Sequence, residues 1–283
     1  MNTSWTLGGS CGRPKLGTGV TTNTSHTVAV EGIGPVEVAV GERGLGRPFL
    51  VLHGGAGPQS VSSFADLLVE TEPARVITPT HPGFGGTPRP EALDSIRGLA
   101  ALYAALLDHL ELTDVTVVGN SIGGWIAAEM ALLGSTRVSS IVLVDAVGIE
   151  VADHPVADFF ALTLAQVAEF SYHDPDSFRI DPSTMPPAQQ SAMAGNRTAL
   201  AVYGGTPSMV DPTLRDRLKA VSLPVLVLWG ESDRIVDPDY GRAYAGAIQT
   251  ARFQLLTGTG HVPQVETPQL LLSHVLRFAA SHA

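Results

Sequence analysis

Short apolar runs alternate with longer amphipathic segments along most of this chain. Six largely apolar runs follow Gly46, at 49–53, 75–80, 115–120, 140–146, 224–230 and 252–258. Strands have this continuous apolar character when helices cover both faces of their sheet. Helical candidates lie between the runs, at 95–112, 122–133, 237–248 and 268–280. Strand and helix alternating in this way predict an open, mostly parallel sheet of the α/β class.

The N-terminal part of the chain has a different pattern. Residues 1–24 are rich in Gly, Thr, Ser and Asn without periodicity, so we expect a flexible leader there. They contain no basic stretch followed by an apolar one, and no signal peptide is expected. Two strand-like runs follow at 26–30 and 35–40, and the glycines between them predict a hairpin.

Residues 149–212 interrupt the alternation of strands and helices. They contain no clear strand, several proline turn signals and an amphipathic stretch at 156–170. We interpret 149–212 as a helical cap laid over the carboxyl edge of the sheet, inserted into a core domain formed by 25–148 and 213–283. The aromatic residues of this segment, Phe159 and Phe160 among them, either contact substrate or form a small core of the cap itself.

Composition and charge narrow the class of protein. Hydrophobic residues make up 44% of the chain and charged residues 16%, which is typical of a globular protein. The formal net charge of −10 argues against binding to nucleic acid or to an anionic membrane surface. The apolar stretch at 156–167 is too short to span a bilayer. The single cysteine, Cys11, cannot form an internal disulfide, so we expect a protein of the reducing cytoplasm. We also expect it to act on a small molecule.

A G-x-S-x-G sequence at 119–123 joins the 115–120 run to the helical candidate that follows it. A very tight turn at this junction would expose Ser121 in a cleft, and its crowding admits only small residues two positions to either side. The backbone N–H of Ile122 would then point at the negative oxygen that develops when Ser121 attacks a carbonyl group. This context favours a nucleophile over a glycine-rich turn with a capping serine.

A second glycine-rich loop, HGGAG at 53–57, follows the first of the six apolar runs. Glycines let the backbone approach a substrate closely, and acyl transfer needs a second N–H donor opposite Ile122. We predict that Gly55 supplies it, with Ala56 as the alternative. His53 precedes the loop at the end of the strand, so we expect a hydrogen-bonded structural role for it rather than that of a base.

An acid and a base follow two further runs. Asp233 comes after 224–230 and His261 after 252–258. The chain order Ser121, Asp233, His261 is one of the known orders of a nucleophile–acid–base triad. Because each residue lies just beyond the carboxyl end of a strand, the three should meet at one edge of the sheet. Asp145, at the end of 140–146, is a rival for the acid, and the triad order favours Asp233.

Together these motifs resemble those of an α/β-hydrolase-fold enzyme with a lid, over roughly residues 25–283. The resemblance implies an eight-stranded sheet whose second strand is antiparallel, with neither a metal nor an organic cofactor. The sequence HPGFGGT at 81–87 matches the glycine-rich loop that this family carries after its fourth strand. The family often has Asp and Ser where this chain has Thr80 and Thr87. A serine at position 121 excludes the related epoxide hydrolases and haloalkane dehalogenases, which have an aspartate there.

The resemblance implies a serine hydrolase that cleaves a small, hydrophobic ester through an acyl-enzyme. The sequence GNSIGG at 119–124 is also similar to that of hydrolases that cleave carbon–carbon bonds in ring-fission products. Those enzymes usually have a tryptophan after the catalytic histidine, where this chain has Val262, and an arginine in the lid, a part that Arg197 would play. A perhydrolase-like side activity and a ligand receptor with little or no turnover are further alternatives. The histidines show no spacing typical of paired metal ligands.

Overall fold

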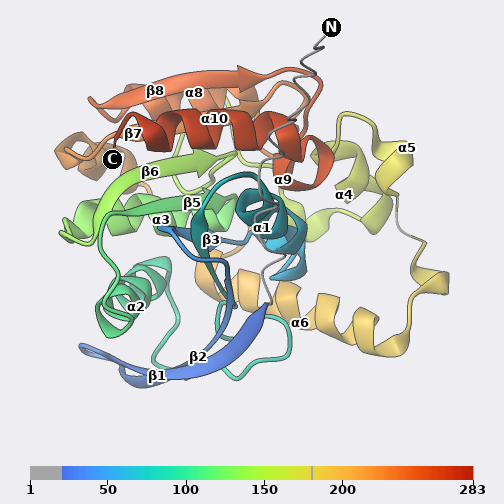
Figure 1. The fold of residues 1–283 in the computed structure, drawn as a ribbon. Coiled ribbons are helices and arrows are strands. Elements are labelled where there is room, and N and C mark those ends of the chain that lie inside the picture. Colours follow the sequence, from blue (N-terminus) through green and yellow to red (C-terminus); the bar gives the residue numbers. More distant parts are fainter. Residues whose placement is uncertain (1–20, 180, 283) are drawn as a thin grey trace, which may run out of the picture.

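The computed structural model describes residues 21–179 and 181–282. Cys11 and most of the predicted leader lie outside the described residues, and the first strand already begins at Thr22. Eight strands form one sheet (Figure 1): β1 (Thr22–Val30), β2 (Gly34–Arg43), β3 (Arg47–Leu52), β4 (Ala74–Pro79), β5 (Val115–Asn120), β6 (Val138–Val144), β7 (Val225–Gly230) and β8 (Ala251–Leu256).

The order of the strands in the sheet is β1-β2-β4-β3-β5-β6-β7-β8. β2 is antiparallel to both of its neighbours, and every pairing from β4 to β8 is parallel. The predicted eight-stranded sheet with an antiparallel second strand is therefore confirmed. The six apolar runs became β3 to β8. Every residue of β5 and β7 is buried, as expected for strands in a sheet that is covered on both sides.

The predicted hairpin is formed by β1 and β2. Val28 pairs with Val36; Gly32 lies in the turn between the strands and Gly34 is the first residue of β2, with φ values of +75° and +99°. These angles lie in the left-handed region, which glycine adopts without a steric penalty.

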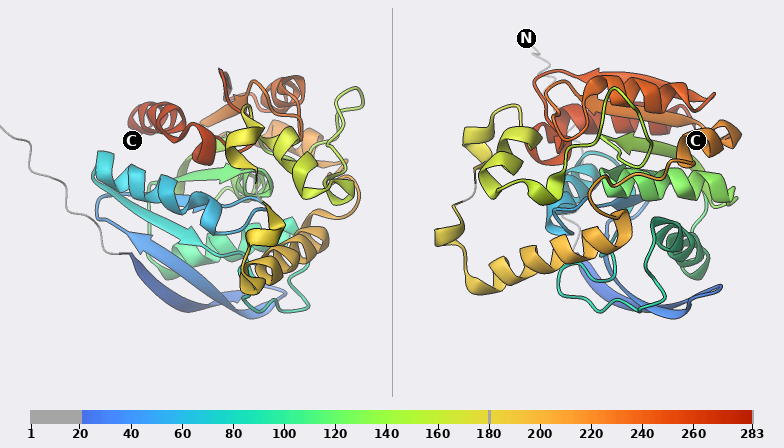
Figure 2. Two further views of the ribbon diagram at one scale, coloured as in Figure 1. Left: turned by 90° about the vertical axis from the view of Figure 1, so that its right-hand side faces the viewer. Right: turned by 180° about the vertical axis from the view of Figure 1, so that it is seen from behind.

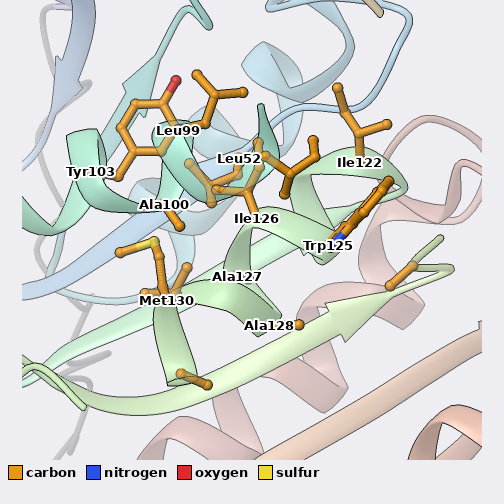
Figure 3. Close-up of a cluster of buried hydrophobic side chains, with 14 of the residues drawn as sticks. Leu52, Leu99, Ala100, Tyr103, Ile122, Trp125, Ile126, Ala127, Ala128 and Met130 are labelled. Carbon is orange, nitrogen blue, oxygen red and sulfur yellow. The ribbon is translucent and has the colours of Figure 1, made fainter. Parts of the chain in front are cut away.

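Helices cover both faces of the sheet (Figures 1 and 2). Alternate residues of a strand point to opposite faces, so that Val117 of β5 joins the hydrophobic cluster under one helical layer and Val118 joins the other. The first layer contains α2 (Ile96–His109), α3 (Ile122–Leu133) and α8 (Pro238–Gly246), and the second contains α1 (Gln59–Thr71) and α10 (Pro268–Ala280). Figure 3 shows part of the first cluster, which includes Trp125 and Ile126 of α3 and Leu52 of β3.

The predicted helices at 122–133 and 268–280 have the expected bounds, and those at 95–112 and 237–248 are shorter by a few residues at their ends. The sequence analysis did not identify α1, although its buried residues recur at helical spacing: Val61, Phe64, Ala65, Leu68 and Val69.

The segment 149–212, called the cap segment below, lies between β6 and β7. Its described residues contain helices and no strand; an isolated bridge joins Gly148 to Val210. The helical elements from here to β7 are η1 (Phe159–Ala161), α4 (Leu164–Ser171), α5 (Pro175–Phe178), η2 (Pro182–Thr184), α6 (Pro187–Gly204), α7 (Leu214–Arg217) and η3 (Leu218–Ala220). Figures 1 and 2 show α4, α5 and α6 beyond the end of the sheet toward which the parallel strands point.

The amphipathic stretch at 156–170 is not one continuous helix. A 3-10 turn, η1, is followed by Leu162 in an extended conformation, and α4 starts again after Thr163. Thr163 forms a capping box with Gln166, in which each residue satisfies a free backbone N–H of the other. This local hydrogen bonding begins a new helix inside a pattern whose apolar spacing looked uninterrupted.

No helix in the described part of the chain has both the length and the apolar character needed to cross a membrane.

Candidate active site

Ser121 occupies a strained turn between β5 and α3. Its backbone angles are φ +57° and ψ −118°, which non-glycine residues rarely adopt. A Cβ atom on Gly119 would lie 2.1 Å from the carbonyl oxygen of Gly123, and one on Gly123 would lie 2.4 Å from that of Leu52. The crowding that the G-x-S-x-G pattern predicts is therefore present on both sides of the serine.

His261 and Asp233 form a buried hydrogen-bonded pair. His261 Nδ1 lies 2.7 Å from Asp233 Oδ2, and the two side chains are 8% and 0% exposed. Asp233 Oδ1 accepts hydrogen bonds from the backbone N–H groups of Ile235 and Val236, at 2.8 and 3.1 Å. With Asp233 accepting from Nδ1–H, the neutral imidazole has its lone pair on Nε2, where it can accept a proton.

The side chain of Asn120 connects the turn at Ser121 to the loop of His261. Asn120 Nδ2 donates to the carbonyl oxygen of His261 at 2.8 Å, and Asn120 Oδ1 accepts from Gln264 Nε2 at 3.0 Å. Among the described residues, the hydroxyl of Ser121 forms no hydrogen bond, to His261 or to any other group. Such bonds are often long without substrate and tighten when it binds. The sequence analysis missed Asn120 and Gln264, although Asn120 precedes the serine directly in the motif.

The glycine-rich loop after β3 runs against Ser121. A Cβ atom on Gly54 would lie 3.1 Å from the Cβ atom of Ser121. The loop closes with a hydrogen bond from the N–H of Gly57 to the carbonyl oxygen of Gly54, at 3.1 Å. Gly55 lies inside this turn, and Ile122 is the first residue of α3. The assignment of their N–H groups to the oxyanion hole stays a prediction.

The rings of His53 and His81 lie against each other at an interplanar angle of 30°, next to this loop. Their ring centroids are 3.7 Å apart, and both side chains are fully buried. His53 Nε2 accepts from the backbone N–H of His81 at 3.1 Å, so His53 Nδ1–H donates to the carbonyl oxygen of Gly54 at 2.8 Å. His81 Nε2–H donates to the carbonyl oxygen of His53, and its Nδ1 accepts from the hydroxyl of Tyr103. The structural role predicted for His53 is confirmed, since both of its ring nitrogens are occupied.

Both histidines of this pair are neutral in the folded protein. Burial lowers the pKa of His53 to about 4, although the hydrogen bond to Gly54 acts in the opposite direction and raises it. Burial, with the neighbouring His53 as a further cause, also holds the pKa of His81 well below its ordinary value. The loop that approaches Ser121 thus rests on uncharged groups with fixed tautomers.

Helices of the cap segment contact three of the loops at this edge of the sheet. Asn196 of α6 accepts from the N–H of Gly85 at 2.8 Å and donates to the carbonyl oxygen of Ala56 at 3.2 Å. The carbonyl oxygen of Ser171, at the end of α4, accepts from the N–H of His261 at 2.7 Å. These bonds hold the cap segment over the loops that carry the candidate site.

The three residues predicted to contact substrate lie together in the cap segment. Arg197 Nη2 donates to the carbonyl oxygens of Phe159 and Phe160, at 3.1 and 2.5 Å. The central carbon of its guanidinium group lies 5.2 and 5.7 Å from the centroids of the two rings. Arg197 therefore ties α6 to η1, and its contact with substrate stays a prediction.

Asp145, the rival acid, does not bond to the histidine. Its Oδ1 accepts from the backbone N–H of Gly230 at 2.7 Å, and its Oδ2 has no hydrogen-bond partner. The hydrogen-bonded acid of His261 is Asp233, as the chain order of the triad predicts.

Two groups of described residues each contain three side chains whose potential metal-ligand atoms lie within 4.8 Å of one another. The first is Asp145, Asp233 and His261, and the second is His154, Asp237 and Asp239. In both groups the histidine Nδ1 is already hydrogen-bonded to an aspartate, in the second at 2.8 Å.

The sequence model of the Alpha/beta hydrolase family matches residues 49–273. The chain belongs to this family. The match extends from β3 to α10 and includes the two glycine-rich loops, Ser121, Asp233 and His261.

Known members of the alpha/beta hydrolase family resemble this chain over most of its length. It is 26% identical over 268 residues to 2-hydroxy-6-oxo-2,4-heptadienoate hydrolase of Pseudomonas putida, covering 88% of this chain and 94% of that protein. It is 27% identical over 233 residues to Lipase 1 of Psychrobacter immobilis, covering 78% and 73%. The solved structure of a thermophilic esterase from Thermogutta terrifontis has the same fold, with a TM-score of 0.72, 23% identity and coverage of 92% and 100%.

Replacing Gly123 by alanine should destabilise this alpha/beta hydrolase at the crowded turn around Ser121. The new Cβ atom would lie 2.4 Å from the carbonyl oxygen of Leu52 and 2.7 Å from that of His53, and backbone atoms cannot yield as a flexible side chain does. We expect a loss of about 1–3 kcal/mol in the free energy of unfolding, measured by denaturant titration. Gly195→Ala in α6 is the control, because its Cβ atom meets nothing within 4 Å. Equal stability of the two variants would contradict the crowding argument.

The burial of His53 and His81 predicts that the free energy of unfolding depends on pH. Because their folded pKa values lie below the unfolded value of about 6.5, the unfolded chain binds protons that the folded protein excludes, and stability is lost as the pH falls from about 6.5 toward 4. Each histidine contributes at most about 1.4 kcal/mol per pH unit in this window. His53→Gln should be less stable at pH 7, and its stability should fall less steeply with acidification. Parallel curves for variant and wild type would contradict the assignment of His53 as a buried neutral group.

Proposed function

We propose that this protein is a serine hydrolase that cleaves a small, hydrophobic ester through an acyl-enzyme, with Ser121 as nucleophile, His261 as base and Asp233 as the acid that orients the histidine. The observation that supports this most directly is the buried 2.7 Å hydrogen bond between His261 Nδ1 and Asp233 Oδ2. Asn120 hydrogen-bonds the loop of that histidine to the strained turn of Ser121. The single cysteine of the chain, Cys11, supports a reducing, cytoplasmic setting.

In this proposal the reaction has two halves. His261 Nε2 removes the hydroxyl proton of Ser121 as the oxygen attacks the ester carbon, because an unassisted serine hydroxyl is a weak nucleophile at neutral pH. The proton then passes to the departing alcohol, and Asp233 stabilises the imidazolium in between. Water attacks the acyl-enzyme with His261 again as base, which releases the carboxylic acid and restores the serine.

The negative oxygen of the tetrahedral intermediate would be held by the N–H groups of Ile122 and Gly55. The first of these lies at the N-terminus of α3, where unpaired N–H groups carry partial positive charge. Losing one such donor typically costs about 10²–10³ in kcat. The pair of His53 and His81 would keep the N–H of Gly55 in place, because His53 Nδ1–H donates to the carbonyl oxygen of the preceding residue, Gly54.

Cleavage of a carbon–carbon bond is the second candidate reaction. It is favoured by the 26% identity to the Pseudomonas putida hydrolase across nearly the whole chain. Two observations argue against it. Val262 stands in place of the tryptophan expected after the histidine, and Nη2 of Arg197 already donates hydrogen bonds to two backbone carbonyl oxygens. Ester hydrolysis is therefore our first choice.

A fluorophosphonate probe should label the protein at Ser121, because such probes phosphonylate an activated serine. Peptide mapping locates the label, and Ser121→Ala should lose both the label and the turnover of p-nitrophenyl esters, whose chain length is then varied. A ring-fission dienoate tested alongside distinguishes the second candidate reaction. Labelling at another residue would overturn the assignment, and a folded protein with neither label nor turnover would favour a ligand receptor.

Asp233→Asn should lower kcat by about 10³–10⁴, because an amide neither selects the Nδ1–H tautomer of His261 nor stabilises its charged form. Asp145→Asn is the matched control, with the same chemical change at the end of the neighbouring strand, and should lower kcat far less. Circular dichroism confirms that both variants are folded. The opposite ranking of the two variants would reassign the acid to Asp145.

A further inference from the structure

A second buried carboxyl group lies beside the acid–histidine pair and has no part in the mechanism above. Asp145 follows the last residue of β6 and is 0% exposed. One of its oxygens, one oxygen of Asp233 and a ring nitrogen of His261 all lie within 4.8 Å of one another. Two ionised carboxylates this close in a buried site repel each other strongly, so that one of them is expected to hold a proton.

The hydrogen-bond donors around the two carboxyl groups show which of them carries the charge. Asp233 accepts three hydrogen bonds, from the N–H groups of Ile235 and Val236 and from His261 Nδ1. Asp145 accepts one, from the N–H of Gly230, and its Oδ2 atom is buried without any partner. Three donors favour the ionised form of Asp233. An ionised Asp145 would leave a negative oxygen desolvated and unpaired, which is costly.

We propose that Asp145 is a neutral carboxylic acid in the folded protein, and that its Oδ2–H donates a hydrogen bond to the carboxylate of Asp233. This bond satisfies the one unpaired oxygen of the pair and adds a fourth hydrogen bond to the three that orient Asp233. Asp145 is then a positioning residue that acts on His261 through Asp233. The positioning role rests on the proposed function, whereas the protonation of Asp145 does not.

The electrostatic surroundings of Asp145 agree with this assignment. Burial, followed by the negative charge of Asp233, raises the pKa of Asp145 well above its ordinary value, and Glu266 adds a smaller repulsion. The N–H of Gly230 opposes the shift. The third titratable group of the cluster is His261, which is bonded to Asp233. Within the described residues, no lysine or arginine forms an ion pair with Asp145.

The backbone at Asp145 allows clean variants. Its φ of +47° lies in the left-handed region, which aspartate, asparagine and glycine tolerate better than other residues. Asp145→Asn retains a carbonyl oxygen for the N–H of Gly230 and offers an N–H to Asp233 where we place the acid proton. Asp145→Gly removes both groups without adding backbone strain.

The protonation is tested by the free energy of unfolding of wild type and Asp145→Asn between pH 4 and 8. The unfolded chain releases the proton of Asp145 near pH 3.9, while the folded protein retains it to a higher pH. The stabilisation that Asp145 contributes is therefore lost as the pH rises, and the unfolding equilibrium constant increases by up to about tenfold per pH unit. We expect the asparagine variant to gain stability relative to wild type with rising pH until the folded pKa is passed. A constant difference, or a variant that fails to fold, would overturn the proposal.

The positioning role is tested by the pH profile of kcat on an ester that Ser121 hydrolyses. Asp145→Asn should stay within about threefold of wild type, and Asp145→Gly should lose at least tenfold in kcat with little change in KM. Because position 145 then cannot ionise, the asparagine variant should also retain its activity to higher pH than wild type. Equal kcat for the two variants would reject the positioning role. Absence of Ser121-dependent turnover would instead reject the proposed function and leave the unfolding test valid.

Discussion

The approach of the α3 N-terminus to the end of β3 is the constraint on which the candidate site depends. At Gly123 the backbone of α3 lies so close to Leu52 and His53 that no side chain fits between them. This contact turns the chain sharply at Ser121, so the strain of that residue is balanced by the burial of α3 against the sheet. It also brings the loop of Gly54 against the serine. The proposed nucleophile and the predicted oxyanion loop are thus positioned by one backbone contact rather than by two separate ones.

Burial also determines the protonation of the polar groups beneath the site. His53 and His81 are neutral because protonating a buried imidazole is costly. The hydrogen bonds of each ring select a single tautomer. The same physics raises the pKa of Asp145, which accepts one hydrogen bond, whereas Asp233 accepts three. Asp233 and His261, the acid and base of the proposed triad, are both buried and hydrogen-bonded to each other.

Much of this arrangement could be predicted because the relevant signals are local. The apolar runs gave the strands, and the positions of Asp233 and His261 just after strand ends predicted that these two side chains would lie at one edge of the sheet, where they form a hydrogen bond. Failures occurred where a local pattern has two readings. Apolar spacing in 156–170 is compatible with one helix, but the capping box at Thr163 divides it. The hydrogen bonds of Arg197 to two backbone carbonyl groups, and of Asn120 to the loop of His261, join residues far apart in the chain.

The sequence by itself determined the class of fold, the order of the strands along the chain, and the crowded turn that carries Ser121, because periodicity and the steric demands of glycine act between near neighbours. Only the tertiary structure decided which aspartate bonds the histidine, since Asp145 and Asp233 both follow strands that end at the same edge. It also decided which carboxyl group has hydrogen-bond donors and which has an unpaired oxygen. Protonation and hydrogen bonding depend on distances of a few ångströms between segments that are remote in the chain, and no local pattern encodes those distances.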